Sequence, residues 1–380
     1  MTAETVLSRA RIVMDKEIIA GSLLLSEGRI AAIEAGPSTV PGAIDCAGDY
    51  LIPGMIELHT DNLDKHIAPR PKVHWPAQSA VIAHDAQIAT AGITTVFDSV
   101  AVGDIDHGSD RLTTLDAMAE GIASCERQGM LRVEHFLHLR CELSHGGLLG
   151  HLEILARHPS LRLISLMDHT PGQRQFASLA SYESYYKNKY QLDDAQLAAF
   201  VERCMADRAR HGETNRAAVV ELTRQRGLKL ASHDDATPAH ADEAAEIGAV
   251  LAEFPTTREA AAALRRHGIK VLTGAPNVVR GESHSGNVSA MALAEEGLVD
   301  ILSSDYVPAS LLPAAFRLVR ELDYTLPAAI RLVAGNPAEA MELEDRGRIA
   351  AGLRADLVRV AERGGLPLVR AVWSQGERVA

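Results

Sequence analysis

Several stretches of this 380-residue sequence end in side chains that bind divalent metal ions. The first is MIELHTD, which closes with His59, Thr60 and Asp61. Residues two apart on a β-strand point to the same side, so the His59 imidazole and the Asp61 carboxylate would face one site together. Imidazole and carboxylate sets of this kind are typical of zinc and manganese sites. The spacing therefore predicts two ligands of one metal centre.

Four further apolar stretches end in the same residue types, closing at Glu142, at Asp168-His169, at His233 and at Asp305. A glutamate between two ions can bridge them, and a pair of ions can activate a water and hold the leaving oxygens. A single histidine at a strand end is more often a hydrogen-bonded structural residue, so it is the shared position that favours a metal site. The predicted ligands are His59, Asp61, Glu142, His169, His233 and Asp305, around one or two ions, with Zn²⁺ favoured and Mn²⁺ as the alternative.

Cationic and hydroxyl side chains follow these same stretches, and such a collection suits a substrate with several phosphate groups. There is no G-x-x-x-x-G-K-[ST] motif, so a P-loop does not hold the phosphate. For any one of these residues a solvated loop charge is the commoner alternative. The predicted substrate-binding residues are Lys65, His66, Arg70, Arg174, Lys187, Arg280, Ser283 and His284. We assign Asp235 to the N-cap of a helix that starts near Pro238, and His74 and His84 to structural roles.

Eight short apolar runs alternate with helical patterns, which indicates parallel strands joined by crossover helices. The predicted fold class is α/β, a (β/α)₈ TIM-type barrel, whose active site lies at the carboxyl ends of the strands. The runs are MIELHTD, ITTVFDSV, RVEHFLHLRCEL, LRLISLMDH, LKLASHDD, GAVLAEF, IKVLTGAP and VDILSSDY. The predicted helices span residues 77–91, 112–127, 192–225, 240–247, 257–267, 287–295 and 309–322.

Both chain ends have a different pattern from the middle of the sequence. Residues 1–53 and 344–380 alternate apolar and polar residues and break at Gly, Pro and Asp, which predicts one small β-sandwich domain formed from both ends. Residues 54–343 are assigned to the barrel. Within them, an insertion at about residues 170–225 is expected to be a lid or a substrate-shaping element.

Bulk composition excludes several functional classes. A net charge of -12 argues against a nucleic-acid binder, which would present a basic face. No apolar run is long enough to cross a bilayer, and no signal-peptide core is present. Four cysteines without a C-x-x-C pair do not suggest a disulfide framework, so a cytoplasmic location is expected.

The motifs LIPGMIELHTD and GRIAAGLRADLV, together with the order of the predicted ligands, resemble the amidohydrolase superfamily. Within it, ELHTDNLDKH, SLMDHTPGQRQF, HGETNR, ASHDD and GAPNVVRGESHSGN resemble the PhnM branch of the carbon–phosphorus lyase pathway, over essentially the whole chain. Two features depart from the superfamily pattern. The first strand carries His59-Thr60-Asp61 in place of H-x-H. The two later histidines, His169 and His233, follow the fourth and fifth strands instead of the fifth and sixth.

The resemblance implies hydrolysis of α-D-ribose 1-methylphosphonate 5-triphosphate to diphosphate and the 5-phosphate, in phosphonate catabolism. It implies a phosphorylated ribosyl phosphonate as the small-molecule substrate, with Asp305 as general base. Barrels of this group often pair, which leaves a homodimer open. One alternative is a cyclic-amide hydrolase or deaminase on the same scaffold, although so many cations argue against it. The alternative of another class is a metal-free barrel that acts as a binding or scaffold protein, although retention of every ligand type argues against that.

Overall fold

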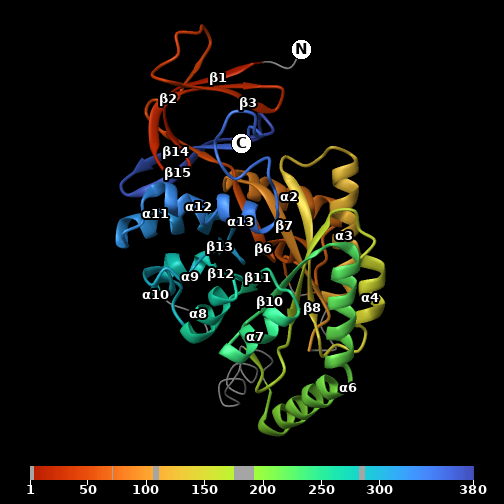
Figure 1. The fold of residues 1–380 in the computed structure, drawn as a ribbon. Helices are drawn as coiled ribbons and strands as arrows, with labels where there is room; N and C mark the ends of the chain where they lie inside the picture. Colours follow the sequence, from red (N-terminus) through yellow and green to blue (C-terminus); the bar gives the residue numbers. More distant parts are fainter. Residues whose placement is uncertain (1–3, 71, 106–110, 175–191, 282–286) are drawn as a thin grey trace.

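The computed structural model describes the whole chain except residues 1–3, 71, 106–110, 175–191 and 282–286 (Figure 1). The described residues form two sheets with different roles. One is a parallel barrel from the middle of the sequence, and the other is a mostly antiparallel sheet built from both chain ends. Three residues assigned to the substrate, Lys187, Ser283 and His284, lie outside the described residues.

All eight predicted runs form the barrel, and this confirms the expected fold. In the described part of the chain, each of these strands pairs in parallel with the next, and a parallel bridge between Thr60 and Asp305 joins the last strand to the first. The strands are β6 (Met55–Thr60), β7 (Ile93–Val102), β8 (Glu134–Glu142), β9 (Leu161–Met167), β10 (Lys229–His233), β11 (Leu251–Glu253), β12 (Lys270–Gly274) and β13 (Ile301–Ser303).

Helices surround this barrel, so its strands are buried on both faces and read as nearly continuous apolar runs. Every residue of β6, for example, is buried. The seven predicted helices are present with ends shifted by a few residues. The helices of the described residues are α1 (Asn62–Ile67), α2 (Ala77–Thr90), α3 (Arg111–Arg127), α4 (Leu148–Leu155), α6 (Asp194–Arg226), α7 (Pro238–Glu246), α8 (Arg258–Arg266), α9 (Ala275–Arg280), α10 (Ala290–Glu295), α11 (Leu311–Glu321), α12 (Leu326–Arg331) and α13 (Gly335–Ala340).

Glu57 closes the barrel at the site side. Its carboxylate accepts hydrogen bonds from the Ser303 hydroxyl at 2.8 Å and from the Ser304 backbone N–H at 2.5 Å. The same carboxylate accepts the His59 backbone N–H at 2.7 Å. Burial raises the pKa of Glu57 to about 7, because the surrounding hydrogen bonds offset only part of the desolvation. Glu57 therefore fixes the ends of β6 and β13, where the first and last predicted ligands lie.

The second sheet curls around a compact core that includes Leu7, Ile12, Leu357 and Trp373. Its strand order is β16-β15-β14-β5-β1-β2-β3, with β4 beside β1, so strands from the two chain ends are neighbours. Figure 1 shows it at the opposite end of the molecule from α6. The strands are β1 (Thr5–Val13), β2 (Ile18–Ser26), β3 (Arg29–Ala35), β4 (Ile44–Asp45), β5 (Tyr50–Pro53), β14 (Leu357–Arg363), β15 (Leu366–Ser374) and β16 (Glu377–Arg378).

Helix α6 is the largest described part of the predicted insertion. It begins in a capping box, in which the Asp193 side chain accepts the Gln196 N–H and the Gln196 side chain accepts the Asp193 N–H. It ends at Gly227, whose φ of 61° is the left-handed conformation that glycine adopts readily. Both ends of this long helix are thus set by local sequence signals.

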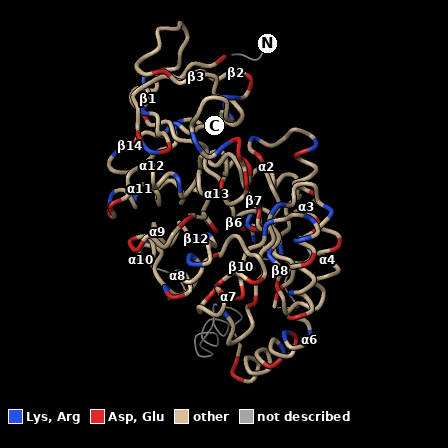
Figure 2. The backbone as a smooth tube through the Cα atoms, in the orientation of Figure 1, with Lys and Arg blue, Asp and Glu red and all other residues tan. Residues whose placement is uncertain are grey.

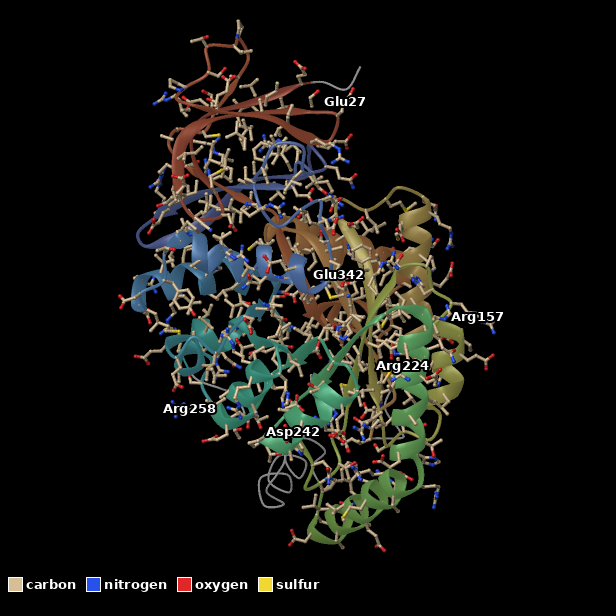
Figure 3. The ribbon with its side chains drawn as sticks, in the orientation of Figure 1. Glu27, Arg157, Arg224, Asp242, Arg258 and Glu342 are labelled. Atoms are coloured by element: carbon tan, nitrogen blue, oxygen red, sulfur yellow. The ribbon has the colours of Figure 1, made fainter. Side chains whose placement is uncertain are left out.

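Charged residues of both signs are interspersed along the elements of the barrel (Figure 2). Arg157 and Arg258 lie at the edges of the molecule in Figure 3, and both of them, like Arg224, pair with neighbouring carboxylates. All four cysteines are buried and none of them forms a disulfide. Among the described residues, no helix has the length and apolar character needed to cross a membrane.

Candidate active site

His233 and Glu253 are in direct contact at the carboxyl ends of two neighbouring strands. His233 closes β10, and its Nδ1 lies 3.0 Å from Glu253 Oε2, at the end of the neighbouring strand β11. The other oxygen, Glu253 Oε1, lies 2.9 Å from His59 Nδ1. The rings of His59 and His233 stack with their centroids 5.6 Å apart. One buried carboxylate therefore holds two of the predicted ligands side by side.

His169 meets a second buried carboxylate. Its Nδ1 lies 2.7 Å from Glu142 Oε2, which joins the ends of β8 and β9. Its Nε2 lies 3.9 Å from Asp234 Oδ2, and His233 Nε2 lies 3.5 Å from the same oxygen. The Nε2 atoms of two histidines and a carboxylate thus converge, with the Nδ1 of each histidine held by a glutamate. A carboxylate on the far ring nitrogen is how proteins orient histidine ligands of a metal.

Asp234 reaches this position through an unusual backbone conformation. Its φ of 55° lies in the left-handed region, where a residue other than glycine is uncommon. Its backbone N–H donates to the carbonyl oxygen of Glu253 at 2.8 Å, which holds the turn after β10 against β11. Asp305 also has a positive φ, of 51°. Two candidate site residues thus lie in sharp turns directly after strands.

A further group lies deeper in the barrel. His138 Nε2 is 3.6 Å from Glu253 Oε1, so His59, His138 and Glu253 bring three ligand-type atoms close together. His138 also contacts the Ser165 hydroxyl at 3.0 Å and the Leu58 carbonyl oxygen at 3.1 Å. Its ring is therefore fixed by neighbours on both sides.

Unpaired buried atoms test whether these residues suit a metal ion. In the described part of the chain, His59 Nδ1, Glu253 Oε1 and Asp61 Oδ1 are buried and make no hydrogen bond. The first two lie 2.9 Å apart but without the geometry of a hydrogen bond, so His59 Nδ1 is left without a hydrogen-bond partner, as a metal-ligand atom would be. Burial lowers the pKa of His59, and lowers that of His233 to about 3, so both rings are neutral, which is the form that binds metal. The donor set therefore fits a divalent cation.

Asp305 lies next to this group. Burial, and then the nearby charge of Asp61, raise the pKa of its carboxyl to about 7. Its backbone carbonyl accepts a 2.6 Å hydrogen bond from the Thr60 hydroxyl. The carboxyl of Asp305 can therefore change protonation near neutral pH while its backbone stays anchored to β6.

Arg140 places a cation inside the barrel. It lies on β8 between His138 and Glu142, and the two-residue repeat of a strand puts all three on the same face. Its charge acts on the pKa of the histidines at 59, 138, 169 and 233 and of Asp305. Among the described residues its buried Nε has no hydrogen-bond partner. An arginine among this many ligand-type groups is suited to an anion bound beside them.

The cations predicted from the first strand lie on or after α1. Lys65 is exposed, and its ammonium donates to the Tyr306 carbonyl in the turn after β13. Arg70 is exposed, whereas His66 is half-buried and turns to Gln87 on α2, at 2.9 Å. Arg280 is exposed at the end of α9. Lys65, Arg70 and Arg280 are therefore exposed at the surface, while His66 contacts a helix.

Asp235 does not cap the helix after β10, and that expectation was wrong. The N-cap is Thr237, which directly precedes Pro238 and whose side chain accepts the His240 N–H. Asp235 is fully buried and instead accepts hydrogen bonds from Arg174 and from the Ser232 hydroxyl. Burial raises the pKa of Asp235 to about 6, and the charge of Arg174 opposes that rise.

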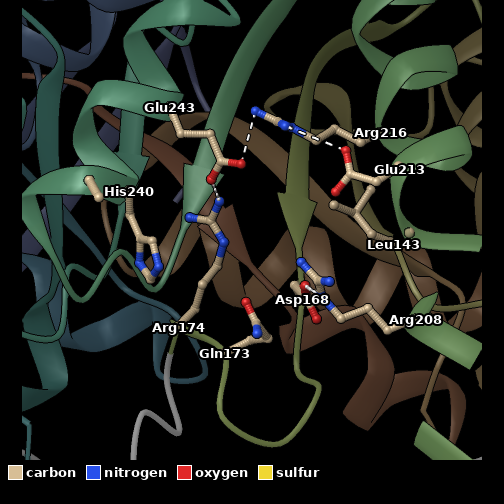
Figure 4. Close-up of a pocket in the computed structure, with 11 residues that line it drawn as sticks. Leu143, Asp168, Gln173, Arg174, Arg208, Glu213, Arg216, His240 and Glu243 are labelled. Carbon is tan, nitrogen blue, oxygen red and sulfur yellow. Dashed lines mark hydrogen bonds and ion pairs between the residues drawn. The ribbon is translucent and has the colours of Figure 1, made fainter. Parts of the chain in front are cut away.

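A polar cavity of about 340 Å³ adjoins this ion pair, between α6 and α7 (Figure 4). Arg174 lines it and also donates to Glu243 on α7 at 2.8 Å. From α6, Arg208 donates to Asp168 at 2.7 Å and Arg216 lies 3.0 Å from Glu243. A larger cavity, of about 680 Å³, lies near Arg346, which contacts the amino ends of β7 and β8, away from these residues.

Besides Asp234, which directly follows His233, three residues of this site were missed in the sequence. His138 and Arg140 lie on the strand face of Glu142, so the two-residue repeat of FLHLRCE was the available signal. Glu253 ends the sixth strand, in GAVLAEF. This run was predicted as a strand, but its terminal glutamate was not among the predicted ligands. The strand count itself holds, since His169 follows the fourth strand, β9, and His233 ends the fifth, β10.

Comparisons with known proteins agree with this architecture. Residues 86–380 match the model of the Amidohydrolase family. The chain is 51% identical over 376 residues to alpha-D-ribose 1-methylphosphonate 5-triphosphate diphosphatase of Escherichia coli (strain K12), with 98% of this chain and 100% of that protein covered.

Solved structures extend the likeness to the fold. N-acetylglucosamine-6-phosphate deacetylase from Pasteurella multocida has a TM-score of 0.63 at 13% identity, with 99% of both chains covered. N-isopropylammelide isopropylaminohydrolase from Burkholderia multivorans has a TM-score of 0.64 at 19% identity, with 100% of this chain and 98% of that chain covered. At these identities the likeness concerns the fold alone.

Proposed function

The chain belongs to the amidohydrolase family, and we propose that it hydrolyses α-D-ribose 1-methylphosphonate 5-triphosphate, releasing diphosphate and leaving the 5-phosphate. The observation that carries this proposal is the 51% identity to a diphosphatase of that name along nearly the whole of both chains. The chain is accordingly a hydrolase of phosphoric anhydride bonds that acts in phosphonate catabolism.

The proposed metal ligands are those of the sequence analysis: His59, Asp61, Glu142, His169, His233 and Asp305. The convergence of His169, His233 and Asp234 supports adding Asp234 to them. A divalent ion held there, with Zn²⁺ favoured over Mn²⁺, would act as a Lewis acid toward a phosphoryl oxygen and make a nearby water more acidic. Glu253 would keep the His233 ring oriented and Glu142 the His169 ring, since each carboxylate contacts Nδ1 and leaves Nε2 toward the centre.

Asp305 is the proposed general base. Its carboxyl group lies among the proposed ligands, and its raised pKa suits proton transfer near neutral pH. It would accept the proton of the water that attacks phosphorus. The anchored backbone of Asp305 would keep the carboxyl at the end of β13 during this transfer.

Cations around the site would neutralise the phosphoryl oxygens, whose charge must be stabilised as the anhydride bond breaks. Arg140 would do so from inside the barrel, beside the proposed ligands. Lys65, Arg70 and Arg280 would act from the exposed rim. This number of cations favours a polyphosphate over the cyclic amide of the alternative hydrolase reading.

Hydrolysis of the ribosyl triphosphate in ¹⁸O-labelled water tests the proposal. We expect release of diphosphate, one labelled oxygen in one of the two products, loss of activity after chelation, and its return with Zn²⁺ or Mn²⁺. Stepwise release of monophosphate, or full activity in the chelated protein, would contradict it. The four buried cysteines, none of them in a disulfide, support a cytoplasmic location, which remains a prediction, as does a homodimer.

A further inference from the structure

The cavity between α6 and α7 is a second polar site that the proposed reaction does not yet use. Its charged lining consists of three guanidiniums, from Arg174, Arg208 and Arg216, and three carboxylates, from Asp168, Glu213 and Glu243. Figure 4 shows these side chains pointing toward one another from the two helices and from the chain after β9. With cations and carboxylates in equal number, the cavity lining is formally neutral.

The cavity shares its wall with the proposed metal site. Asp168 directly precedes His169, and the Arg174 partner Asp235 directly follows Asp234. At the end of β9, Asp168 lines the cavity and His169 belongs to the proposed metal site. At the end of β10, Asp234 belongs to the metal site and Asp235 pairs with Arg174 of the cavity. The cavity and the proposed metal site are therefore adjacent, separated by the residues at these two strand ends.

A neutral polar lining selects what can bind. A triphosphate carries several negative charges, and three nearby carboxylates would repel it while the guanidiniums are already paired. A sugar suits the lining better, because carboxylates accept hydrogen bonds from hydroxyl groups. One singly charged group can also be accommodated, because one arginine retains free donors. Within the described part of the chain, the hydrogen bond of Arg208 to Asp168 is donated by Nε, which leaves its two terminal nitrogens as donors. Its side chain is 35% exposed.

The backbone leaves room for this arginine. Gly212 lies inside α6, one turn after Arg208, and a Cβ there would be 3.3 Å from Arg208 Cγ. Glycine in a helix interior weakens the helix relative to alanine, so its presence is accounted for by space in the cavity rather than by helix stability. Leu143 and Ala239 add small apolar surfaces to the otherwise polar lining.

We propose that this cavity binds the ribose and its 1-methylphosphonate group, while the 5-triphosphate extends to the metal site. The inference rests on the proposed function. The esterified methylphosphonate carries one negative charge, for the free donors of Arg208, and one methyl group, for Leu143 or Ala239. Because the C1 substituent and the C5 group of an α-D-ribofuranoside lie on opposite faces of the ring, a substrate held in this way points its 5-substituent away from the cavity. The cavity would therefore select for the phosphonate, and the barrel would perform the hydrolysis.

The test compares two substrates, the full ribosyl methylphosphonate triphosphate and ribose 5-triphosphate, which lacks the phosphonate. The variant is Arg208→Gln, with Arg210→Gln as the matched control on the exposed side of α6, where its side chain is 69% exposed. We expect the wild type to prefer the full substrate in kcat/KM. In Arg208→Gln that preference should fall by about 10-fold or more, mainly through KM, and it should be unchanged in the control.

Equal losses on both substrates would overturn the proposal, because they would show that Arg208 only supports His169 through Asp168. Failure of the wild type to release diphosphate from either substrate would instead refute the proposed function, so the two failures are distinct. Calorimetric titration with ribose 1-methylphosphonate gives a readout without turnover. We expect saturable binding to the wild type and binding weakened about 10-fold or more in Arg208→Gln. Absence of binding to the wild type would also overturn the proposal.

Discussion

Glu253 Oε2 accepts a hydrogen bond from His233 Nδ1 at 3.0 Å, across two neighbouring barrel strands. This contact fixes which ring nitrogen of His233 carries the proton. With Nδ1–H directed at Glu253, the lone pair of Nε2 faces Asp234 Oδ2, 3.5 Å away. A carboxylate on a strand of three residues thus determines how a candidate ligand on the next strand is presented.

Replacing Glu253 by glutamine should weaken metal binding. The amide keeps the volume but loses the charge that orients the His233 ring, and loss of such a partner costs about 10- to 100-fold in metal affinity. Competition with a chelator measures this affinity, and activity should return at high metal concentration. The control is Glu246→Gln, at an exposed position on α7. Unchanged affinity in Glu253→Gln would mean that His233 is not a ligand or needs no such support.

Asp305→Asn should abolish turnover while most of the bound metal remains. The amide cannot accept the proton of the attacking water, whereas His59, His169 and His233 would still hold the ion. Removal of a general base costs about 10²- to 10⁴-fold in kcat. Elemental analysis of the purified variant gives the metal content, and a coupled diphosphate assay gives the rate. Near-full activity with metal bound would show that another group is the base.

The sequence allowed the barrel to be predicted because each buried strand carries its own local signal. Buried parallel strands read as short apolar runs. Because all the strands of the barrel run in the same direction, the residues at their carboxyl ends lie on the same side of it. Glu253 was missed because a glutamate in an apolar run looks like the end of that run, although it is fully buried in the fold. The sequence does indicate Thr237 as the N-cap, because this threonine directly precedes Pro238. The predicted cap, Asp235, lies two residues too early.

The cavity could not be predicted in the same way. Its ion pairs join residues far apart in sequence, such as Arg174 with Glu243 and Arg208 with Asp168. Which carboxylate pairs with which arginine depends on how α6 packs against α7 and the chain after β9. No periodicity or spacing in the sequence encodes that packing, although the motifs DHTPGQRQF and HGETNR supply most of the charged residues.

Arg174→Ala should destabilise the fold in addition to any effect on the substrate. Its guanidinium pairs with the fully buried Asp235 and with Glu243, so its removal leaves a buried carboxylate without its cation. Removing one partner of a buried ion pair lowers the free energy of unfolding by about 3 kcal/mol. Urea unfolding measures the loss, with the exposed Arg210→Ala as control, for which we expect a change below about 0.5 kcal/mol. Equal stability of the two variants would show that the Asp235 carboxyl becomes protonated at little cost.

A buried hydrogen-bond network of His84, Asp98 and His135 should make the stability of the fold depend on pH. In the interior of the described fold, His135 Nδ1 lies 2.7 Å from Asp98 Oδ2 and His84 Nε2 lies 2.7 Å from Asp98 Oδ1. Burial alone would lower the pKa of His135, but the charge of Asp98 and a contact with Asp85 outweigh it and raise the pKa to about 9. A histidine with a raised pKa stabilises the fold fully below its unfolded pKa, near 6.5, and this contribution is lost as the pH rises toward 9.

The unfolding free energy should therefore fall with rising pH between about 6.5 and about 9, by at most about 1.4 kcal/mol per pH unit from this group. Urea unfolding of the wild type and of His135→Gln, at several pH values in that window, isolates the contribution as a difference. Glutamine can still donate to Asp98 but does not titrate, so the variant should show a flatter dependence. Carboxyls with raised pKa values, such as those of Glu57 and Asp235, affect both proteins equally and cancel in the difference. Parallel pH dependences would mean that the pKa of His135 is the same in the folded and unfolded chains, and that Asp98 is compensated by His84 alone.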